Sequence, residues 1–141
     1  MIVMKFGGAS LASPASIKRV ASIVLSQVHR DPVVVVSALG DTTDQLLGIL
    51  EHASRAESYL AWKLQEEVKT HHFCVAEDLL GPEHLGPIDQ YIRETFRNLH
   101  VRMLEISEGE RILTLELRDW VVSLGTTVEQ DCGGCAPSPW H

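Results

Sequence analysis

The sequence predicts an α/β fold that begins with a βαβ unit and continues into a helical segment. Three observations lead to this expectation. A short apolar run, residues 2–6, ends at two glycines; an amphipathic run with helical spacing follows; four consecutive valines, residues 33–36, come next. A strand, a helix and a second strand in this order form a parallel βαβ unit. The chain up to Gly125 then keeps a helical periodicity, so we expect an inserted or flanking helical layer.

The first strand, residues 2–6 (IVMKF), is short, apolar and rich in β-prone residues. Ser13 has the side chain of a helix N-cap and Pro14 suits the first helical position, so the first helix starts there. Its apolar residues recur at helical spacing, which predicts that one face packs on the sheet; they are Ile17, Val20, Ala21, Val24 and Val28. The valine run predicts a second strand that is covered on both faces, as parallel strands usually are.

Four further segments complete the expected order. Residues 41–53 start with a capping pattern and predict a helix, and residues 58–80 consist mostly of helix formers. A turn-rich stretch, GPEHLGP at 81–87, precedes an amphipathic helix, and residues 112–125 predict the last helix. The apolar residues of the helix after the turn are Ile88, Ile92, Phe96, Leu99 and Met103.

The composition narrows the functional classes. The chain has 141 residues, 45% of them hydrophobic, and a formal net charge of −7. This acidic balance argues against a nucleic-acid partner, because phosphate backbones require a basic face. The sequence has no apolar run of the roughly 20 residues that span a bilayer, so we expect no membrane segment. The start lacks the pattern of a secretion signal, and we therefore expect a cytoplasmic protein.

Several residues that could bind a metal or form an ion pair have a simpler interpretation. Cys132 and Cys135 form a CxxC, but a zinc site needs further ligands and His141 is the nearest candidate. We interpret this pair as incidental and assign no metal ligand. His71 and His72 are adjacent and point to different sides of a helix, so we expect a solvated face instead of a metal pair. Finally, Arg118 and Asp119 suggest an ordinary surface ion pair.

The loop after the first strand, KFGGAS, could hold an anion. Lys5 lies near the end of the strand, and Gly7 and Gly8 follow it. Glycines allow positive φ and a close approach of backbone N–H groups to phosphate, while a lysine neutralises its charge. A plain turn with an incidental lysine is the alternative. The pattern differs from GxxxxGK[ST] and from GxGxxG, so neither of those mechanisms applies.

A second loop, SALGDTTD at residues 37–44, follows the second strand. Ser37, Thr42 and Thr43 bring hydroxyl groups to the edge of the sheet where the first loop lies. Two such loops could hold a small polar substrate next to a phosphate. Alternatively, these hydroxyl groups cap the following helix, or one threonine caps it while the other binds.

The order VMKFGGAS, PVVVVSALGDTTDQLL and LRDWVVSLG resembles the aspartokinases of the amino-acid kinase family over residues 1–125. The resemblance implies the carbamate kinase-like α/β fold of that family, present here in part. It also implies ATP-dependent, Mg²⁺-dependent phosphorylation of the side-chain carboxylate of L-aspartate, the first step of lysine, threonine and methionine biosynthesis. The parent enzyme would be a homo-oligomer.

The resemblance assigns residues to the two loops. It places ATP phosphates at Lys5, Phe6, Gly7, Gly8 and Ser10, with Lys5 as the catalytic residue. It places L-aspartate at Ser37, Ala38 and Thr43.

The chain departs from the family pattern in three places. Ala9 stands where a hydroxyl residue is usual, Ser13 where an acidic residue or asparagine is common, and Thr126 where SLG is followed by a glutamate. Residues 126–141 (TTVEQDCGGCAPSPWH) show no periodicity. With permitted codons, a one-base shift converts the residues after SLG into ERLSSRIAAGALQAHG, a helix-forming continuation. We therefore expect residues 1–125 to be the amino-terminal part of a catalytic domain and residues 126–141 to be a frameshifted tail.

Two other functions stay open. The chain could derive from another amino-acid kinase, such as a glutamate or uridylate kinase, although GDTTDQLL argues against this. It could also be a non-catalytic α/β module. If the chain is part of an aspartate kinase, we expect it to be inactive alone, because the half of the kinase fold that holds the nucleotide is not present in it.

Overall fold

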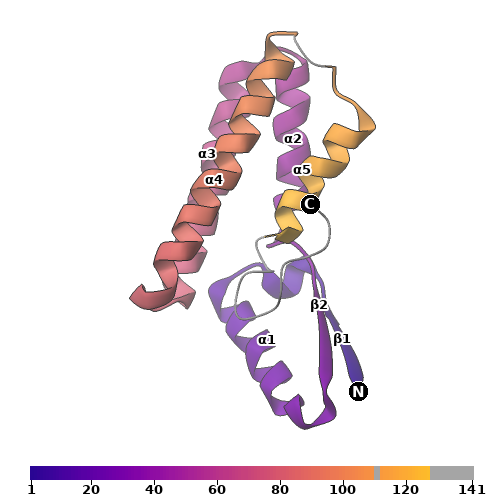
Figure 1. The fold of residues 1–141 in the computed structure, drawn as a ribbon, viewed down its shortest axis with the longest axis vertical. Coiled ribbons are helices and arrows are strands. Elements are labelled where there is room, and N and C mark those ends of the chain that lie inside the picture. Colours follow the sequence, from indigo (N-terminus) through magenta and orange to yellow (C-terminus); the bar gives the residue numbers. More distant parts are fainter. Residues whose placement is uncertain (110–111, 128–141) are drawn as a thin grey trace.

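The computed structural model describes residues 1–109 and 112–127 and confirms the α/β class. A two-stranded βαβ unit lies at one end of the molecule, and a layer of four helices lies at the other (Figure 1). The elements are β1 (Ile2–Phe6), the short 3₁₀ helix η1 (Gly8–Leu11), α1 (Pro14–Ser26), η2 (Val28–Arg30), β2 (Pro32–Val36), α2 (Thr42–Ser54), α3 (Ser58–Leu79), α4 (Pro82–Ser107) and α5 (Leu115–Thr127).

The two strands pair in parallel, as expected. Their register runs from Ile2 opposite Pro32 to Phe6 opposite Val36. One more backbone hydrogen bond extends the ladder, because the Ser37 N–H donates to the Phe6 carbonyl at 3.0 Å. The carboxyl ends of both strands therefore lie side by side, and the loops that follow them start from neighbouring positions.

The prediction that the valine strand is covered on both faces is wrong for the described residues. Val33, Val34 and Val35 are 47%, 39% and 45% exposed. Val33 and Val35 share a face with Lys5 and with Val3, which is 65% exposed. No described element packs on that face. The valine run is typical of a strand buried on both faces, but one face of this sheet is left uncovered among the described residues.

Helix α1 begins where its capping residues predict. The Ser13 hydroxyl accepts a hydrogen bond from the Ser16 N–H at 3.2 Å, and Pro14 is the first helical residue. The face of α1 that is buried is narrower than the predicted one. Among its apolar residues Val20 is buried, whereas Ala21 is exposed and Val28 lies beyond the helix in η2.

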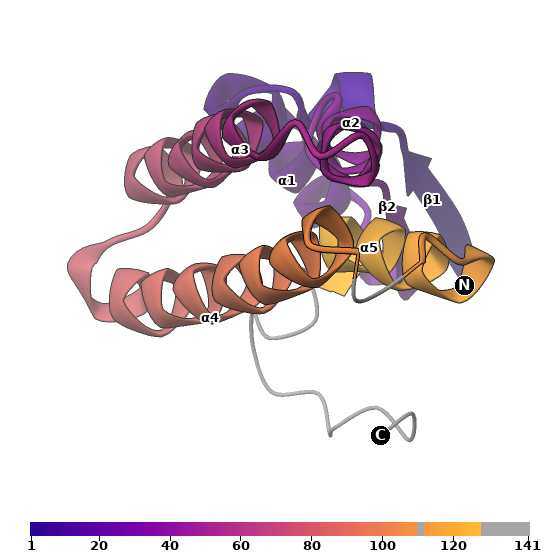
Figure 2. The ribbon, with the colours of Figure 1, turned by 90° about the horizontal axis from the view of Figure 1, so that it is seen from above.

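The hydrophobic core lies in the helical layer. Helices α3 and α4 run side by side, α2 packs against both of them, and α5 packs against α2 (Figure 2). The core residues come from all four helices: Leu46, Ile49, Leu50, Ala53, Ala61, Val68, Ala76, Ile92, Phe96, Leu99, Met103, Ile106, Leu117 and Val121. All five apolar positions predicted for the helix after the turn lie in this core or against it.

Two predicted boundaries differ from the observed ones by three residues or more. The stretch expected to be a turn is helical, because Gly81 serves as the N-cap, Pro82 occupies the first turn of α4, and Pro87 lies inside the helix. A proline in the first turn loses no helical hydrogen bond, which explains why Pro82 starts a helix. The last helix begins at Leu115, three residues after the predicted start at Ile112.

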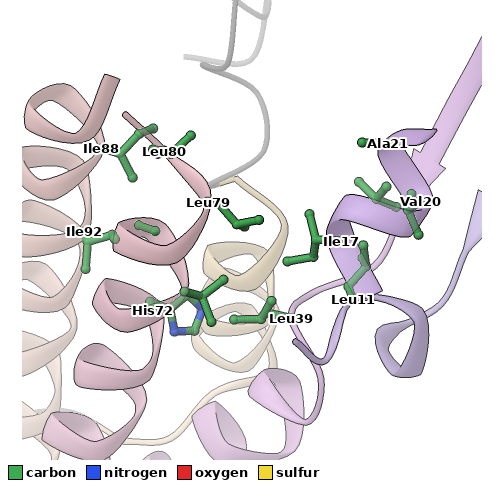
Figure 3. A pocket seen from close by; sticks show the side chains of 13 residues that line it. Leu11, Ile17, Val20, Ala21, Leu39, His72, Leu79, Leu80, Ile88 and Ile92 are labelled. Carbon is green, nitrogen blue, oxygen red and sulfur yellow. The ribbon is translucent and has the colours of Figure 1, made fainter. Parts of the chain in front are cut away.

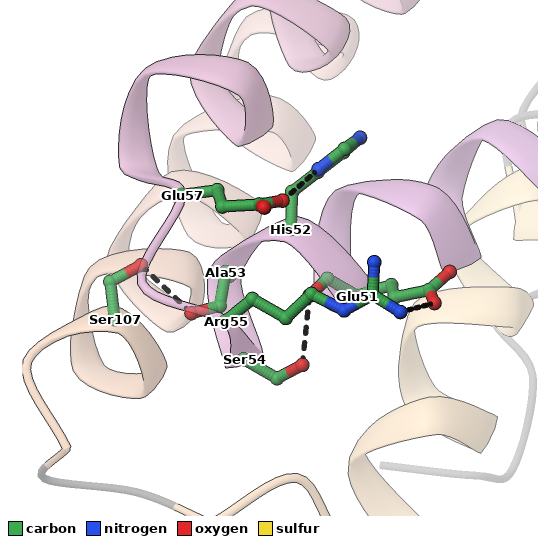
Figure 4. A network of polar contacts seen from close by, with 7 residues as sticks. All are labelled: Glu51, His52, Ala53, Ser54, Arg55, Glu57 and Ser107. Carbon is green, nitrogen blue, oxygen red and sulfur yellow. Dashed lines mark hydrogen bonds and ion pairs between the residues drawn. The ribbon is translucent and has the colours of Figure 1, made fainter.

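Polar contacts fix the connection between α2 and α3 (Figure 4). His52 Nδ1 lies 2.6 Å from Glu57 Oε2 across the turn, and Arg55 Nη2 donates to Glu51 Oε1 at 2.6 Å. The Ser107 hydroxyl donates to the Ala53 carbonyl at 3.4 Å, which links the end of α4 to this turn. The contacts hold the upper end of the helical layer together. None of the described helices is both long and apolar enough to cross a membrane.

Candidate functional site

The loops after β1 and β2 meet at the carboxyl ends of the strands. A Cβ atom added to Gly8 would lie 2.6 Å from the Gly40 carbonyl oxygen and 3.3 Å from the Ala38 carbonyl oxygen. Real Cβ atoms do not approach an oxygen to 2.6 Å, so glycine is required at position 8 by the neighbouring loop. Together with the hydrogen bond between Ser37 and Phe6, this contact places the two predicted loops in one site.

The glycines of this site differ in their roles. Gly40 has a φ of +51°, in the left-handed region that favours glycine. Gly7 has a φ of −84°, so the positive φ expected of the glycine pair is not used there. A Cβ atom at Gly7 would meet no atom within 4 Å. Neither packing nor backbone conformation therefore demands glycine at position 7.

The residues assigned to phosphate lie on β1 and η1. Phe6 ends the strand and is half-buried, whereas Lys5 and Ser10 are exposed. The Ser10 N–H donates to the Gly7 carbonyl at 2.9 Å and closes the turn. Among the described residues no hydrogen bond joins the side chain of Lys5 or Ser10 to the second loop. Both side chains are free to contact a ligand.

The residues assigned to aspartate have unequal access. Ser37 and Thr43 are partly exposed, so their hydroxyl groups can reach a ligand, but Ala38 is 5% exposed. The neighbouring Thr42 is 2% exposed and its hydroxyl donates to the Leu39 carbonyl at 2.6 Å. This hydroxyl fixes the loop instead of facing a ligand, and it does not cap α2, whose N-cap residue is Asp41. Of the two threonines, Thr43 is the one available for binding.

Sequence reasoning did not assign Gly40 to the site. The residue shapes the loop and sets its distance from Gly8, and the glycine in SALGD is the signal that could have identified it. No group of three or more His, Cys, Asp or Glu side chains that could hold a metal is found within residues 1–109 and 112–127.

The sequence model of the Amino acid kinase family matches residues 1–129. The chain belongs to the amino acid kinase family. This assignment accords with the two glycine-containing loops at the ends of parallel strands, and with the resemblance found in the sequence.

Curated relatives of this family member carry aspartokinase names. Aspartokinase 2 of Arabidopsis thaliana is 35% identical over 125 residues, which is 87% of this chain and 22% of the relative. The aspartokinase of Mycolicibacterium smegmatis is 45% identical over 58 residues, which is 40% of this chain and 14% of the relative. The bifunctional aspartokinase/homoserine dehydrogenase 1 of Zea mays is 34% identical over 105 residues, or 74% of this chain and 11% of the relative. The chain therefore spans about a fifth or less of the length of these relatives.

Apart from the two loops, an apolar hollow of about 350 Å³ lies between the βαβ unit and the ends of α3 and α4 (Figure 3). Leu11, Ile17 and Val20 line it from one side, and Leu79 and Ile92 line it from the other. Its walls offer few groups that could hold a phosphate or a carboxylate, so the loops suit a polar ligand better than this hollow does.

His72 borders this hollow and corrects the prediction of a solvated histidine pair. It is 9% exposed, and its Nδ1 lies 2.8 Å from the Val68 carbonyl, so this nitrogen carries the proton and donates. Burial lowers the pKa of His72, because the charged imidazolium is poorly solvated there. His71 is exposed, as expected.

The remaining candidates stay outside the site. Arg118 and Asp119 are both exposed on α5, and the described residues show no ion pair between them. Cys74 is an exposed free cysteine on α3. The CxxC residues Cys132 and Cys135, together with His141, lie outside the described residues.

Proposed function

We propose that this chain carries the phosphate-contacting and aspartate-contacting loops of an ATP-dependent aspartate kinase. The reaction transfers the γ-phosphoryl group of ATP to the side-chain carboxylate of L-aspartate and yields β-aspartyl phosphate and ADP. One observation carries the proposal: the Gly7–Gly8 turn and the loop from Ser37 to Thr43 are joined at the carboxyl ends of two parallel strands. Ligands of open α/β sheets bind at this edge.

The first loop would act on the phosphates. Open space surrounds the position of a Cβ atom at Gly7, and the proposal gives this space to phosphate oxygens that accept hydrogen bonds from the loop N–H groups. Phosphoryl transfer spreads negative charge over the oxygens of the transferred group. The exposed ammonium group of Lys5 would stabilise that charge, and the Ser10 hydroxyl would contact a phosphate oxygen.

The second loop would orient L-aspartate. Ser37 and Thr43 would hydrogen-bond the amino acid, while Ala38 would contribute its backbone because its side chain is buried. The attacking oxygen belongs to the substrate carboxylate itself, so the protein needs no covalent nucleophile. Its contribution is to place the carboxylate in line with the γ-phosphorus and to stabilise the charge that develops.

Mg²⁺ would reach the site bound to the nucleotide. Magnesium in kinases is held largely by substrate phosphates and water, with one or two carboxylates. A loop with glycine N–H groups and a lysine fits a nucleotide that brings its own metal. When bound, the ion would neutralise part of the phosphate charge.

Calorimetric titration of the 141-residue chain tests the substrate assignment. L-Aspartate, L-glutamate and UMP are compared, and binding of L-aspartate alone is expected. Ser37→Ala should weaken aspartate binding by about tenfold, the effect of losing a hydrogen bond to a charged ligand. Ser22→Ala is the matched control, because Ser22 is exposed on α1 and bonds the Lys18 carbonyl. Binding of L-glutamate or UMP in place of aspartate would assign another kinase of the family.

The same titration separates a kinase segment from a non-catalytic module. A chain that unfolds cooperatively yet binds neither L-aspartate nor MgATP would support the module. We propose that the chain alone does not turn over, so a coupled assay for ADP should show no rate above background. A measurable rate that Lys5→Ala abolishes would contradict this last point and strengthen the assignment of Lys5.

We also propose that residues 126–141 result from a one-base shift of the reading frame. Resequencing the DNA across the Gly125 codon tests this directly. A recovered base that restores glutamate after Gly125 would support the proposal. An unchanged frame would show that the tail is native to the gene.

A further inference from the structure

We propose that the apolar hollow between the βαβ unit and the ends of α3 and α4 binds a small, uncharged aromatic molecule that carries one N–H or O–H donor. Among the thirteen described residues that line the hollow, twelve have apolar side chains and one, His72, is polar. None of the residues assigned to ATP or to L-aspartate lines it, so the proposal is independent of the kinase assignment.

The size and the walls of the hollow fit an aromatic body. Its volume is about 350 Å³. An engineered apolar cavity of roughly 150 Å³ holds benzene, so a molecule of two fused rings has room here. Leu39 of the second loop, Leu79 of α3 and Ile88 of α4 are half-buried and offer apolar surface to it. Covering that surface favours binding, whereas a charged ligand would lose its hydration without gaining an opposite charge.

His72 offers one hydrogen-bond acceptor to the hollow. Its Nδ1 donates to the Val68 carbonyl at 2.8 Å, so the neutral ring keeps its lone pair on Nε2. In the part of the chain that the structure describes, no hydrogen bond reaches Nε2, and this atom is not among the unpartnered ones that the fold seals from solvent. Figure 3 shows the His72 side chain extending from α3 on the side where Leu39 lies. A donor on a ligand in the hollow can therefore reach Nε2.

The His72 ring is held in place by its neighbours. The hydrogen bond to Val68 fixes it on α3, and the centroid of the Phe96 ring of α4 lies 6.0 Å from its own. Burial also lowers the pKa of His72, which keeps the ring uncharged at neutral pH. A fixed, uncharged acceptor selects a ligand that donates one hydrogen bond, because a ligand without a donor would cover Nε2 and leave it unpaired.

Indole and benzofuran provide a direct test, because they share a two-ring body and differ by an N–H group in place of an ether oxygen. Each is titrated at pH 8, where His72 is uncharged, into the chain labelled with ¹⁵N-histidine. Indole is expected to bind about tenfold more tightly than benzofuran, the effect of one hydrogen bond to a buried acceptor. Indole should also shift the ¹⁵N resonance of His72 Nε2, identified by its loss in His72→Leu, more than that of Nδ1.

Two variants at neighbouring histidines locate the interaction. His72→Leu removes the acceptor and keeps an apolar wall, so indole should lose its advantage over benzofuran. His71→Leu, at the exposed neighbouring position, is the control and should keep the preference for indole. Equal binding of the two molecules by the unmodified chain, an unchanged preference in His72→Leu, or no binding by a chain with a helical circular-dichroism spectrum would each overturn the proposal. A chain without that spectrum would overturn it as well, since the hollow requires α1 packed on α3.

Discussion

The βαβ unit buries far fewer side chains than the helical layer does. Within residues 1–36 the buried side chains are Leu11 and Val20, and the strand residues Val3, Val33, Val34 and Val35 are exposed. In the helical layer, α2 to α5 bury a continuous core with Ile49, Leu99 and Val121 at 0% exposure. The helices therefore supply the folding free energy of the described chain, while the strands supply the backbone positions of the candidate site. The site loops lie between the two regions, where Ala38 of the second loop and Thr42 at the start of α2 are buried.

The largest effect is expected from a cavity in the helical core. Leu99→Ala should lower the free energy of unfolding by about 2–5 kcal/mol, because Leu99 is 0% exposed. Val34→Ala on β2 removes a side chain that is 39% exposed and should cost less than about 1 kcal/mol. Urea denaturation followed by circular dichroism measures both. Equal losses would break the contrast between the two regions.

A smaller effect is expected where the two regions meet. Gly8→Ala forces the loops apart, because the new Cβ would lie 2.6 Å from the Gly40 carbonyl oxygen. Overpacking of this kind costs about 1–3 kcal/mol. Gly7→Ala is the matched control for stability, because its Cβ would meet no atom within 4 Å. A Gly8→Ala protein as stable as Gly7→Ala would show that the loops do not approach each other so closely.

These contrasts explain which parts of the fold the sequence could predict. Local signals were sufficient for the cap at Ser13 and for the strand at residues 2–6, since each depends on neighbouring residues. The prediction that the valine strand is covered on both faces was wrong, because no described residues pack on one of its faces. Pro82 suggested a turn, yet the same residue is tolerated at the start of a helix.

The candidate site was predictable in its loops but not in its contacts. The residues after each strand were identified because parallel strands bring their carboxyl ends together. The approach of Gly8 to Gly40 depends on the register of strands that are distant in sequence, which no local pattern reports. His72 was misassigned although Val68 and Val75 are spaced about one helical turn on either side of it, on the apolar face of α3.

The smallest effect concerns the pH dependence of stability. Because burial lowers the pKa of His72, the unfolded chain binds a proton at this residue more readily than the folded chain. The folded state is therefore destabilised as the pH falls below the ordinary histidine pKa of about 6.5. His72→Leu should show a smaller loss of stability between pH 7.5 and 5 than the unmodified chain. His71→Leu removes only the weaker charge repulsion that His71 exerts on His72, so it should reduce the loss less than His72→Leu does. Identical profiles for all three proteins would contradict the burial of His72.

Hydrogen exchange of the 141-residue chain, with and without MgATP and L-aspartate, tests the central claim most directly. We predict that the ligands slow exchange at the amides of Gly7, Gly8 and Ser37, in the region with the least buried surface. Amides in the cores of α2 and α4 should keep their already slow exchange. Protection confined to the helical layer, or no change at the loops while the helices remain protected, would contradict the assignment of the two loops as the kinase site.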